Sequence, residues 1–309
     1  MKKIDAHLHL ADVIAGYCRR GELRAIGQGK AMWGNGEVFQ LIPAEYGDSW
    51  NFRAEKALEL MDESGVERAV LMHGSMYGFQ NQYHATLLEK YPDRFCPSCT
   101  VDPFMINHYE TLKHYLEDLH FHLVKFEISS GGGLMGCHDA FPLDSDRMMK
   151  IYELIEKNHG VVALDVGDIT MPSHQPAALA RIADAFPNLK IVVCHLLAPM
   201  ADHREEWKAS LRMLKKPNVW FDLAALPKIV DADPYPYPSV HEVIREAKEI
   251  LGADRLMWGT DAPFACAHDA ESTYEHLTDY LEKQSIFTPE ELQAFYYDNA
   301  YQVYFPEEG

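Results

Sequence analysis

The chain has 309 residues, of which 47 are Asp or Glu and 28 are Lys or Arg, so its formal net charge is −19. This acidic balance argues against a nucleic-acid partner, because phosphate binding needs a basic face. With 47% apolar residues, the composition is that of a globular protein and not of a disordered chain.

Short β-rich runs alternate with longer amphipathic segments along the whole chain. Two of these runs, 161–164 and 191–194, are continuously apolar, as expected of parallel strands that are buried on both faces. The same reasoning predicts eight strands in all, over residues 3–10, 68–73, 95–101, 123–128, 161–166, 190–196, 219–225 and 255–259.

Helical patterns lie between these strands. Ala57, Leu58 and Met61 have the spacing of one buried helix face, and Gly65 ends that segment. The run 288–291 is a helix start, with a Thr N-cap, Pro at the first helical position and Glu in the first turn. The predicted helices begin with 52–64 and continue with 145–158, 175–186, 204–214, 239–251, 271–281 and the segment from 288.

This alternation predicts a single-domain α/β protein over 1–309 with the (β/α)8 TIM-barrel fold. An open doubly wound sheet is the alternative, but no GxGxxG motif follows the first strand. Two long connections, 15–50 and 129–144, follow the first and fourth strands. They lie at the rim where barrel active sites are built, so both are candidate lids.

The first strand ends in an HxH motif formed by His7 and His9. Residues i and i+2 of a strand face the same side, so the two imidazoles are expected to form half of a metal site. The alternative is a pair of hydrogen-bonded structural histidines. His195 ends the sixth strand and Asp261 follows the eighth. In a closed barrel these side chains open onto the same cavity, which predicts a metal centre there.

These motifs, together with the stretches 60–70 and 288–300, resemble the amidohydrolase superfamily. The similarity runs from Asp5 to Tyr304 and is greatest to the branch of aminocarboxymuconate-semialdehyde decarboxylase and related aromatic-acid decarboxylases. The resemblance implies one divalent ion, usually zinc. It would be held by His7, His9, a fifth-strand histidine and Asp261, with His195 as general acid or base.

The fifth strand departs from this family pattern, since Asp165 stands where the third histidine ligand is usual. A carboxylate also binds Zn²⁺, and we predict that Asp165 is a ligand. Two histidines and two carboxylates make the site neutral around a divalent ion, which shifts the preference toward harder ions such as Mn²⁺. The alternatives are a substrate contact for Asp165 and a site that has lost its metal.

Other polar residues are weaker candidates. His73 and Arg53 are predicted to contact substrate, although a structural histidine and an ion-paired arginine explain them as well. Lys125 occupies roughly the place of the carboxylated lysine that bridges two metals in some superfamily members, a role that a mononuclear site does not use. Asp222 is expected to hydrogen-bond a neighbouring strand.

The expected function is the metal-dependent hydrolysis of a small carboxylate, amide or lactone, with proton transfer by His195 or Asp261. Non-oxidative decarboxylation of a small aromatic acid is the alternative on the same scaffold. It needs a fixed cation for the carboxylate, and the absence of a strand-end arginine favours hydrolysis. A metal-free barrel with a binding role is the alternative from another class.

The longest apolar run, 191–201, is far shorter than the roughly 20 residues that span a bilayer. The six cysteines are scattered and do not have the spacing of a disulfide framework. We therefore expect a cytoplasmic protein that acts on a small molecule, without a membrane or nucleic-acid partner. The resemblance alone suggests a homodimer.

Overall fold

The computed structural model describes residues 1–46, 50–267 and 271–305. Its central sheet has eight parallel strands, and each overlaps the range predicted for it. They are β1 (Lys3–Leu8), β6 (Val66–Leu71), β7 (Phe95–Cys99), β8 (Leu123–Glu127), β9 (Val161–Asp165), β10 (Lys190–Val193), β11 (Val219–Asp222) and β12 (Leu256–Met257).

Backbone hydrogen bonds join the first strand to the last and so close the sheet into a barrel. The N–H of Ala6 donates to the carbonyl of Trp258 at 3.0 Å, and the N–H of Asp261 donates to the carbonyl of His7 at 2.8 Å. The predicted (β/α)8 barrel is therefore confirmed, with the HxH strand beside the segment that carries Asp261.

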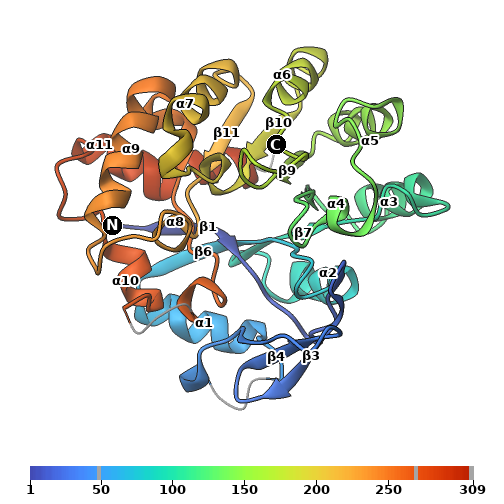
Figure 1. Cartoon of the computed structure of the whole chain (residues 1–309), viewed down its shortest axis with the longest axis horizontal. Helices are drawn as coiled ribbons and strands as arrows, with labels where there is room; N and C mark the ends of the chain where they lie inside the picture. Colours follow the sequence, from blue (N-terminus) through green and yellow to red (C-terminus); the bar gives the residue numbers. More distant parts are fainter. Residues whose placement is uncertain (47–49, 268–270, 306–309) are drawn as a thin grey trace.

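Helices surround the strands on the outside (Figure 1). Four of them were not predicted, namely α2 (Asn81–Lys90), α3 (His108–Glu117) and the short α4 (Leu134–Cys137) and α8 (Leu226–Ile229). The buried face of α2 carries Asn81 and His84 beside Leu87, and α3 buries only Leu112 and Leu116, so hydrophobic periodicity gives no clear signal in either. The helices are α1 (Ala54–Glu63), α2 (Asn81–Lys90), α3 (His108–Glu117), α4 (Leu134–Cys137), α5 (Asp146–Lys157), α6 (Pro176–Ala185), α7 (Arg204–Met213), α8 (Leu226–Ile229), α9 (Pro238–Leu251), α10 (Tyr274–Asp279), α11 (Pro289–Gln293) and α12 (Asn299–Tyr304).

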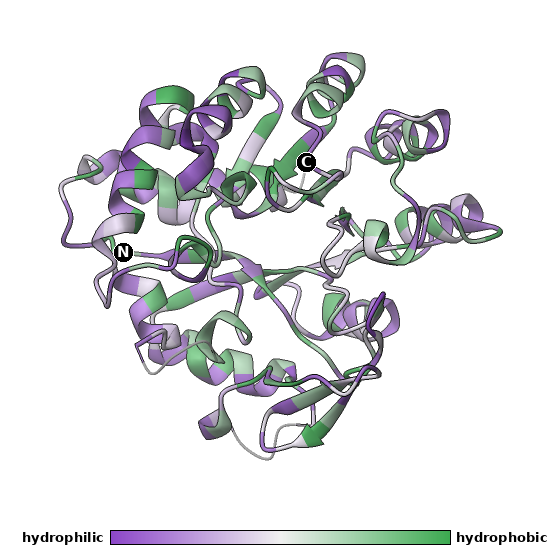
Figure 2. Ribbon diagram, in the orientation of Figure 1, coloured by the Kyte–Doolittle hydropathy of each residue, from purple (hydrophilic) through white to green (hydrophobic). Residues whose placement is uncertain are grey.

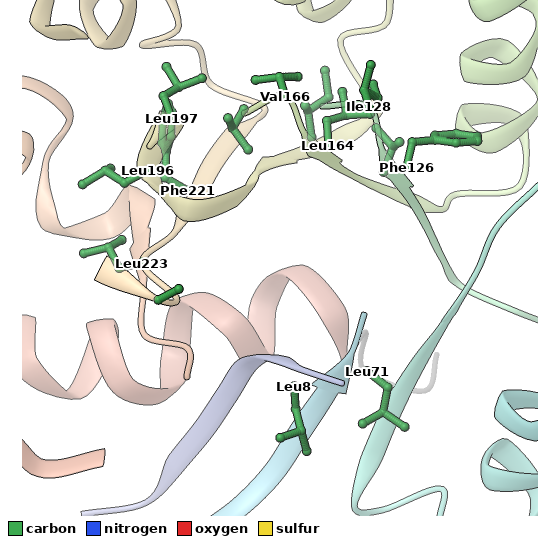
Figure 3. Close-up of a cluster of buried hydrophobic side chains, with 14 of the residues drawn as sticks. Leu8, Leu71, Phe126, Ile128, Leu164, Val166, Leu196, Leu197, Phe221 and Leu223 are labelled. Atoms are coloured by element: carbon green, nitrogen blue, oxygen red, sulfur yellow. The ribbon is translucent and has the colours of Figure 1, made fainter. Parts of the chain in front are cut away.

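Apolar side chains form two layers that follow the alternation of each strand. The outer layer lies between strands and helices, and Figure 3 shows members such as Leu8, Leu71 and Leu164 pointing away from the space that the strands enclose. The inner layer contains Ile4 and Ala6 with residues of α12, which therefore closes one end of the barrel. Figure 2 shows the same division, with apolar strands inside and polar residues on the outward sides of the helices.

The connection after β1, a candidate lid in the sequence analysis, contains secondary structure that was not predicted. It contains a four-stranded antiparallel sheet of β2 (Tyr17–Cys18), β3 (Gly21–Gly27), β4 (Lys30–Trp33) and β5 (Val38–Gln40). In β4, buried Ala31 and Trp33 alternate with exposed neighbours, but a pattern of four residues is too short to predict a strand. Residues 47–49 of the predicted connection lie outside the described residues.

Two further predictions have clear outcomes. The helix start at 288–291 is confirmed, because Thr288 and Glu291 form a capping box at the beginning of α11. The predicted strand 190–196 is too long, since β10 ends at Val193. Among the described helices, none combines the length and the apolar character that a membrane span requires.

Candidate metal centre

Three of the predicted ligands meet at the end of the barrel where β1 and β12 adjoin. His9 Nε2 lies 2.9 Å from Asp261 Oδ1 and 3.2 Å from His7 Nε2, and His7 Nε2 lies 3.7 Å from the same carboxylate oxygen. All three residues are buried. The structure therefore brings the HxH pair and the eighth-strand aspartate together around one point.

An irregularity in β1 turns both histidines inward. Ile4 and Ala6 belong to the inner layer, so regular alternation alone would point His7 outward. However, the pairing register of β1 with β6 shifts between Asp5 and Leu8, and such irregularities re-aim side chains. Leu8 joins the outer layer, and the histidines on either side of it face the barrel interior.

Hydrogen bonds fix the tautomers of both histidines. His9 Nδ1 lies 2.8 Å from the carbonyl oxygen of Met72, which can only accept, so this nitrogen carries the proton. His7 Nδ1 lies 3.1 Å from Asp222 Oδ2 and donates to that carboxylate. Burial lowers the pKa of His7 to about 4, although Asp222 opposes the shift, so the ring is neutral. In each ring Nδ1 therefore carries a proton, and Nε2 is the atom turned toward the other histidine and Asp261.

The Nε2 atoms of both histidines and a carboxylate oxygen of Asp261 thus converge on one point, with His9 Nε2 at hydrogen-bond distance from Asp261 Oδ1. A positive charge at this point satisfies these groups, either as a proton that His9 Nε2 donates to Asp261 Oδ1 or as a metal ion that all three bind. Imidazole nitrogen and carboxylate oxygen are ordinary ligands of Zn²⁺, and histidine ligands typically donate their other N–H to a carboxylate or carbonyl. His7 donates its other N–H to the carboxylate of Asp222, and His9 donates its other N–H to the carbonyl of Met72. The residues present therefore fit a divalent metal ion.

Asp222, at the end of β11, connects two parts of this centre. Its Oδ2 accepts from His7, and its Oδ1 accepts the backbone N–H groups of His195 at 3.0 Å and Ala224 at 3.3 Å. Burial alone would raise the pKa of Asp222, but His7 and His195 lower it to about 2. The sequence analysis predicts a hydrogen bond across strands for Asp222 and misses its role in fixing the His7 tautomer.

We expect Asp222→Asn to weaken metal binding about 10- to 100-fold, the usual effect of losing an outer partner. The two backbone donors require the amide oxygen at the Oδ1 position, so the amide NH₂ faces His7 Nδ1. His7 must then accept there and carry its proton on Nε2, where the lone pair is needed. Competition with a chelating dye measures the affinity.

Asp102→Asn is a matched control for this variant. It makes the same chemical change in another histidine–aspartate pair, since Asp102 Oδ2 lies 2.8 Å from His138 Nε2, and it should leave metal affinity unchanged. Equal affinities of the wild type and Asp222→Asn would show that Asp222 does not set the tautomer.

Asp5 holds the metal-binding segment of β1 against the turn that carries Asp261. Its Oδ1 accepts the backbone N–H groups of His7 at 3.1 Å and Thr260 at 2.9 Å, and its Oδ2 accepts the hydroxyls of Thr260 and Tyr274 at 2.6 and 3.1 Å. The sequence analysis gives Asp5 no role, because Thr260 and Tyr274 lie more than 250 positions away along the chain.

His195 occupies a strained turn beside the three ligand candidates. The residues from His195 to Ala198 all have φ between 44° and 60°, and left-handed non-glycine residues are unfavourable by about 1–2 kcal/mol each. Strain of this kind persists where the surroundings determine the conformation. Here the N–H of His195 donates to Asp222, and its Nδ1–H donates to the carbonyl of Ala224 at 3.0 Å. The ring lies 4.6 Å from that of His7, between centroids.

Asp165 approaches the centre from β9 through His195. Its Oδ2 lies 3.6 Å from His195 Nε2, which is an ion-pair distance, and its Oδ1 accepts the N–H of Gly167. Burial would lower the pKa of His195, but Asp165 and the other carboxylates raise it to about 10. Within the described residues Asp165 forms no hydrogen bond or ion pair with His7, His9 or Asp261. Its predicted ligand role therefore stays a prediction.

The two predicted substrate contacts have structural partners in the protein. His73 donates from Nδ1 to Ser98 and accepts the N–H of Gln80 at Nε2, at 3.0 Å each, although its ring lines a cavity. Arg53 forms an ion pair with Asp12 at 2.7 Å before α1 and lines neither of the two main cavities. The structure therefore gives Arg53 no contact with the centre.

Two cavities of about 540 and 530 Å³ share Glu127 and Gly132 in their walls, and neither wall includes His7, His9 or Asp261. The first includes Gly74, where an added Cβ would lie 3.2 Å from His9 Cε1. The second lies between the small sheet and the segment after Asp261, and its walls include Phe264 and Lys228. Volumes of this size suit small organic ligands.

Comparisons with known proteins agree with this architecture. Residues 4–305 match the family model described as Amidohydrolase. Over 99 residues the chain is 36% identical to L-fucono-1,5-lactonase of Burkholderia ambifaria, and the match spans 31% of this chain and 33% of that enzyme.

Two solved structures share the fold over most of the chain. An amidohydrolase from Burkholderia multivorans with bound zinc has a TM-score of 0.72 at 14% identity, over 98% of this chain and 99% of that one. The 2,6-dihydroxybenzoate decarboxylase from Rhizobium has a TM-score of 0.58 at 18% identity, over 82% and 89%.

Proposed function

Because the chain belongs to the amidohydrolase family, we propose that it is a metal-dependent hydrolase that opens the ring of a small lactone. One observation carries the proposal, namely the convergence of the two histidine Nε2 atoms and the Asp261 carboxylate. The identity to a lactonase over part of the chain supports the choice of reaction. His7, His9 and Asp261 would hold one divalent ion, with zinc as the first expectation and manganese as the alternative.

A bound divalent ion would polarise the scissile carbonyl and lower the pKa of a water molecule. His195 is the proposed proton carrier beside it. Since its Nδ1–H is committed to Ala224 and its pKa is raised by the neighbouring carboxylates, Nε2 carries the proton that would pass to the leaving oxygen. Asp165, at 3.6 Å from this atom, stabilises the protonated ring. Asp261 uses Oδ1 toward His9, so its second oxygen is the alternative proton acceptor.

Decarboxylation of a small aromatic acid remains the second candidate reaction on this scaffold. The sequence analysis sets it aside for want of a fixed cation, but Lys228 lies in the wall of the second cavity. The presence of a cation therefore no longer separates the two reactions. The partial identity to a lactonase is the observation that favours hydrolysis.

The proposal is tested by acid release from a panel of lactones, with L-fucono-1,5-lactone as the first member. The metal-loaded protein should accelerate ring opening, a chelator should abolish this activity, and added Zn²⁺ or Mn²⁺ should restore it. The same preparation is given 2,6-dihydroxybenzoate while CO₂ is recorded. CO₂ release without lactone opening would establish the second candidate reaction, and neither activity at any metal loading would contradict an enzymatic role.

Asp165 is proposed as a fourth ligand, and we expect Asp165→Ala to weaken metal binding several-fold or more, because an oxygen ligand is removed. Asp165→His should keep the metal and shift the preference toward zinc, since imidazole is the softer ligand. Elemental analysis and metal titration of both variants measure these effects. If Asp165→Ala binds metal like the wild type but loses turnover, Asp165 acts through His195 instead.

A further inference from the structure

Lys228 is a half-buried cation without an anionic partner. It lies on α8, just after the strand that carries Asp222, and its Nζ is 3.0 Å from the centroid of the Phe264 ring. In the described part of the chain, the Nζ atom forms no ion pair, whereas surface lysines such as Lys216 and Lys90 pair with carboxylates. Burial lowers the pKa of Lys228 to about 8, and the charge of Asp261 opposes this shift.

A buried ammonium group needs compensation that the protein does not fully supply. The aromatic face of Phe264 provides a cation–π contact, but it satisfies none of the three N–H donors of the lysine. Phe264 stands three positions after Asp261, so the cation is anchored to the segment that carries a proposed ligand. The chain as a whole is acidic, with a net charge of −19. An ammonium group without a carboxylate partner nevertheless attracts anions locally.

The cavity around Lys228 has the shape and chemistry for a small ring. Its volume is about 530 Å³, and its walls include Trp33, Phe39 and Phe264. Phe39 packs edge-to-face against Phe264 at 5.9 Å between centroids. The other cation in the wall, Arg20, is already paired with Glu37 at 3.1 Å. Lys228 is therefore the cation in this wall whose charge no carboxylate of the described residues pairs with.

We propose that Lys228 binds a carboxylate group of the substrate and so directs the enzyme to small cyclic carboxylate anions. This inference rests on the proposed function and names the substrate class of that same site. The ring would pack on the aromatic wall while its carboxylate pairs with the ammonium group. A charge-assisted hydrogen bond of this kind is stronger than one between neutral groups.

The test uses the full-length, metal-loaded protein with benzoate and benzamide as probes, which share a ring and differ in charge. Titration calorimetry is carried out at pH 6.5, where the lysine is charged. Benzoate should bind the wild type more tightly than benzamide. Lys228→Met should weaken benzoate binding about tenfold or more and leave benzamide binding unchanged, whereas Lys228→Arg should retain the preference for benzoate.

Lys113→Met is the control for net charge, since Lys113 is exposed on α3 and pairs with Glu117. It should not alter either affinity, and metal content should be equal in all variants. Benzoate affinity that is the same in the wild type and Lys228→Met would overturn the inference, because the carboxylate would then be bound elsewhere, for example by the metal. This result is independent of turnover, so a failure to hydrolyse lactones would contradict the proposed function alone.

Discussion

Replacing either His7 or His9 by alanine should remove the metal from the protein while the barrel remains folded. Each variant deletes one of the two Nε2 atoms that converge with Asp261, and the remaining pair of ligands is too few for a tetrahedral site. Loss of an outer partner alone weakens metal binding 10- to 100-fold, so loss of a direct ligand should exceed about 100-fold. Metal titration after chelation measures the affinity.

His84→Ala is a matched control for these two variants. His84 is also a fully buried histidine, but it lies on α2 and donates to the carbonyl of Ser98 at 2.7 Å. The control should lose stability and keep the metal, which separates the deletion of a ligand from the deletion of any buried imidazole. Undiminished metal content in His7→Ala and His9→Ala would remove both residues from the proposed ligand set.

The second large effect is expected at His195, where His195→Asn should lower kcat by about 10²- to 10⁴-fold, the usual contribution of a general acid or base. Asparagine tolerates the left-handed conformation that His195 adopts at φ 55°, so the turn is kept and only the imidazole is lost. The metal should remain bound. Lactone turnover and metal content, measured on the same preparation, test the two parts of this prediction.

His195 also belongs to a group with His7 and Asp261 in which possible ligand atoms lie within 4.8 Å of one another. A His195→Asn variant that loses its metal would therefore identify His195 as a ligand. A variant with full turnover and full metal content would show that His195 takes no part in proton transfer.

The strands and the residues at their ends could be predicted from the sequence because a barrel has a strong pattern. Continuous apolar runs such as Ile191 to Val193 mark buried parallel strands, and a polar residue directly after such a run must face the rim. By contrast, β4 is too short to give a periodic signal, and α2 turns polar residues toward the core.

The contacts that orient the centre could not be predicted, because they depend on backbone geometry and on distant partners. The register shift in β1 decides which way His7 points, and no residue type marks such a shift. The left-handed turn at His195 contains no glycine. Lys228 follows no strand-end motif, and its importance arises only from its distance to Phe264 and from the lack of an ion pair with any described residue.

The central claim is that one divalent ion binds where His7, His9 and Asp261 converge. Elemental analysis of the wild-type protein, purified without chelators and then incubated with Zn²⁺ or Mn²⁺ before desalting, tests it most directly. The account predicts about one divalent ion per chain. A protein that retains no metal after either incubation would contradict it.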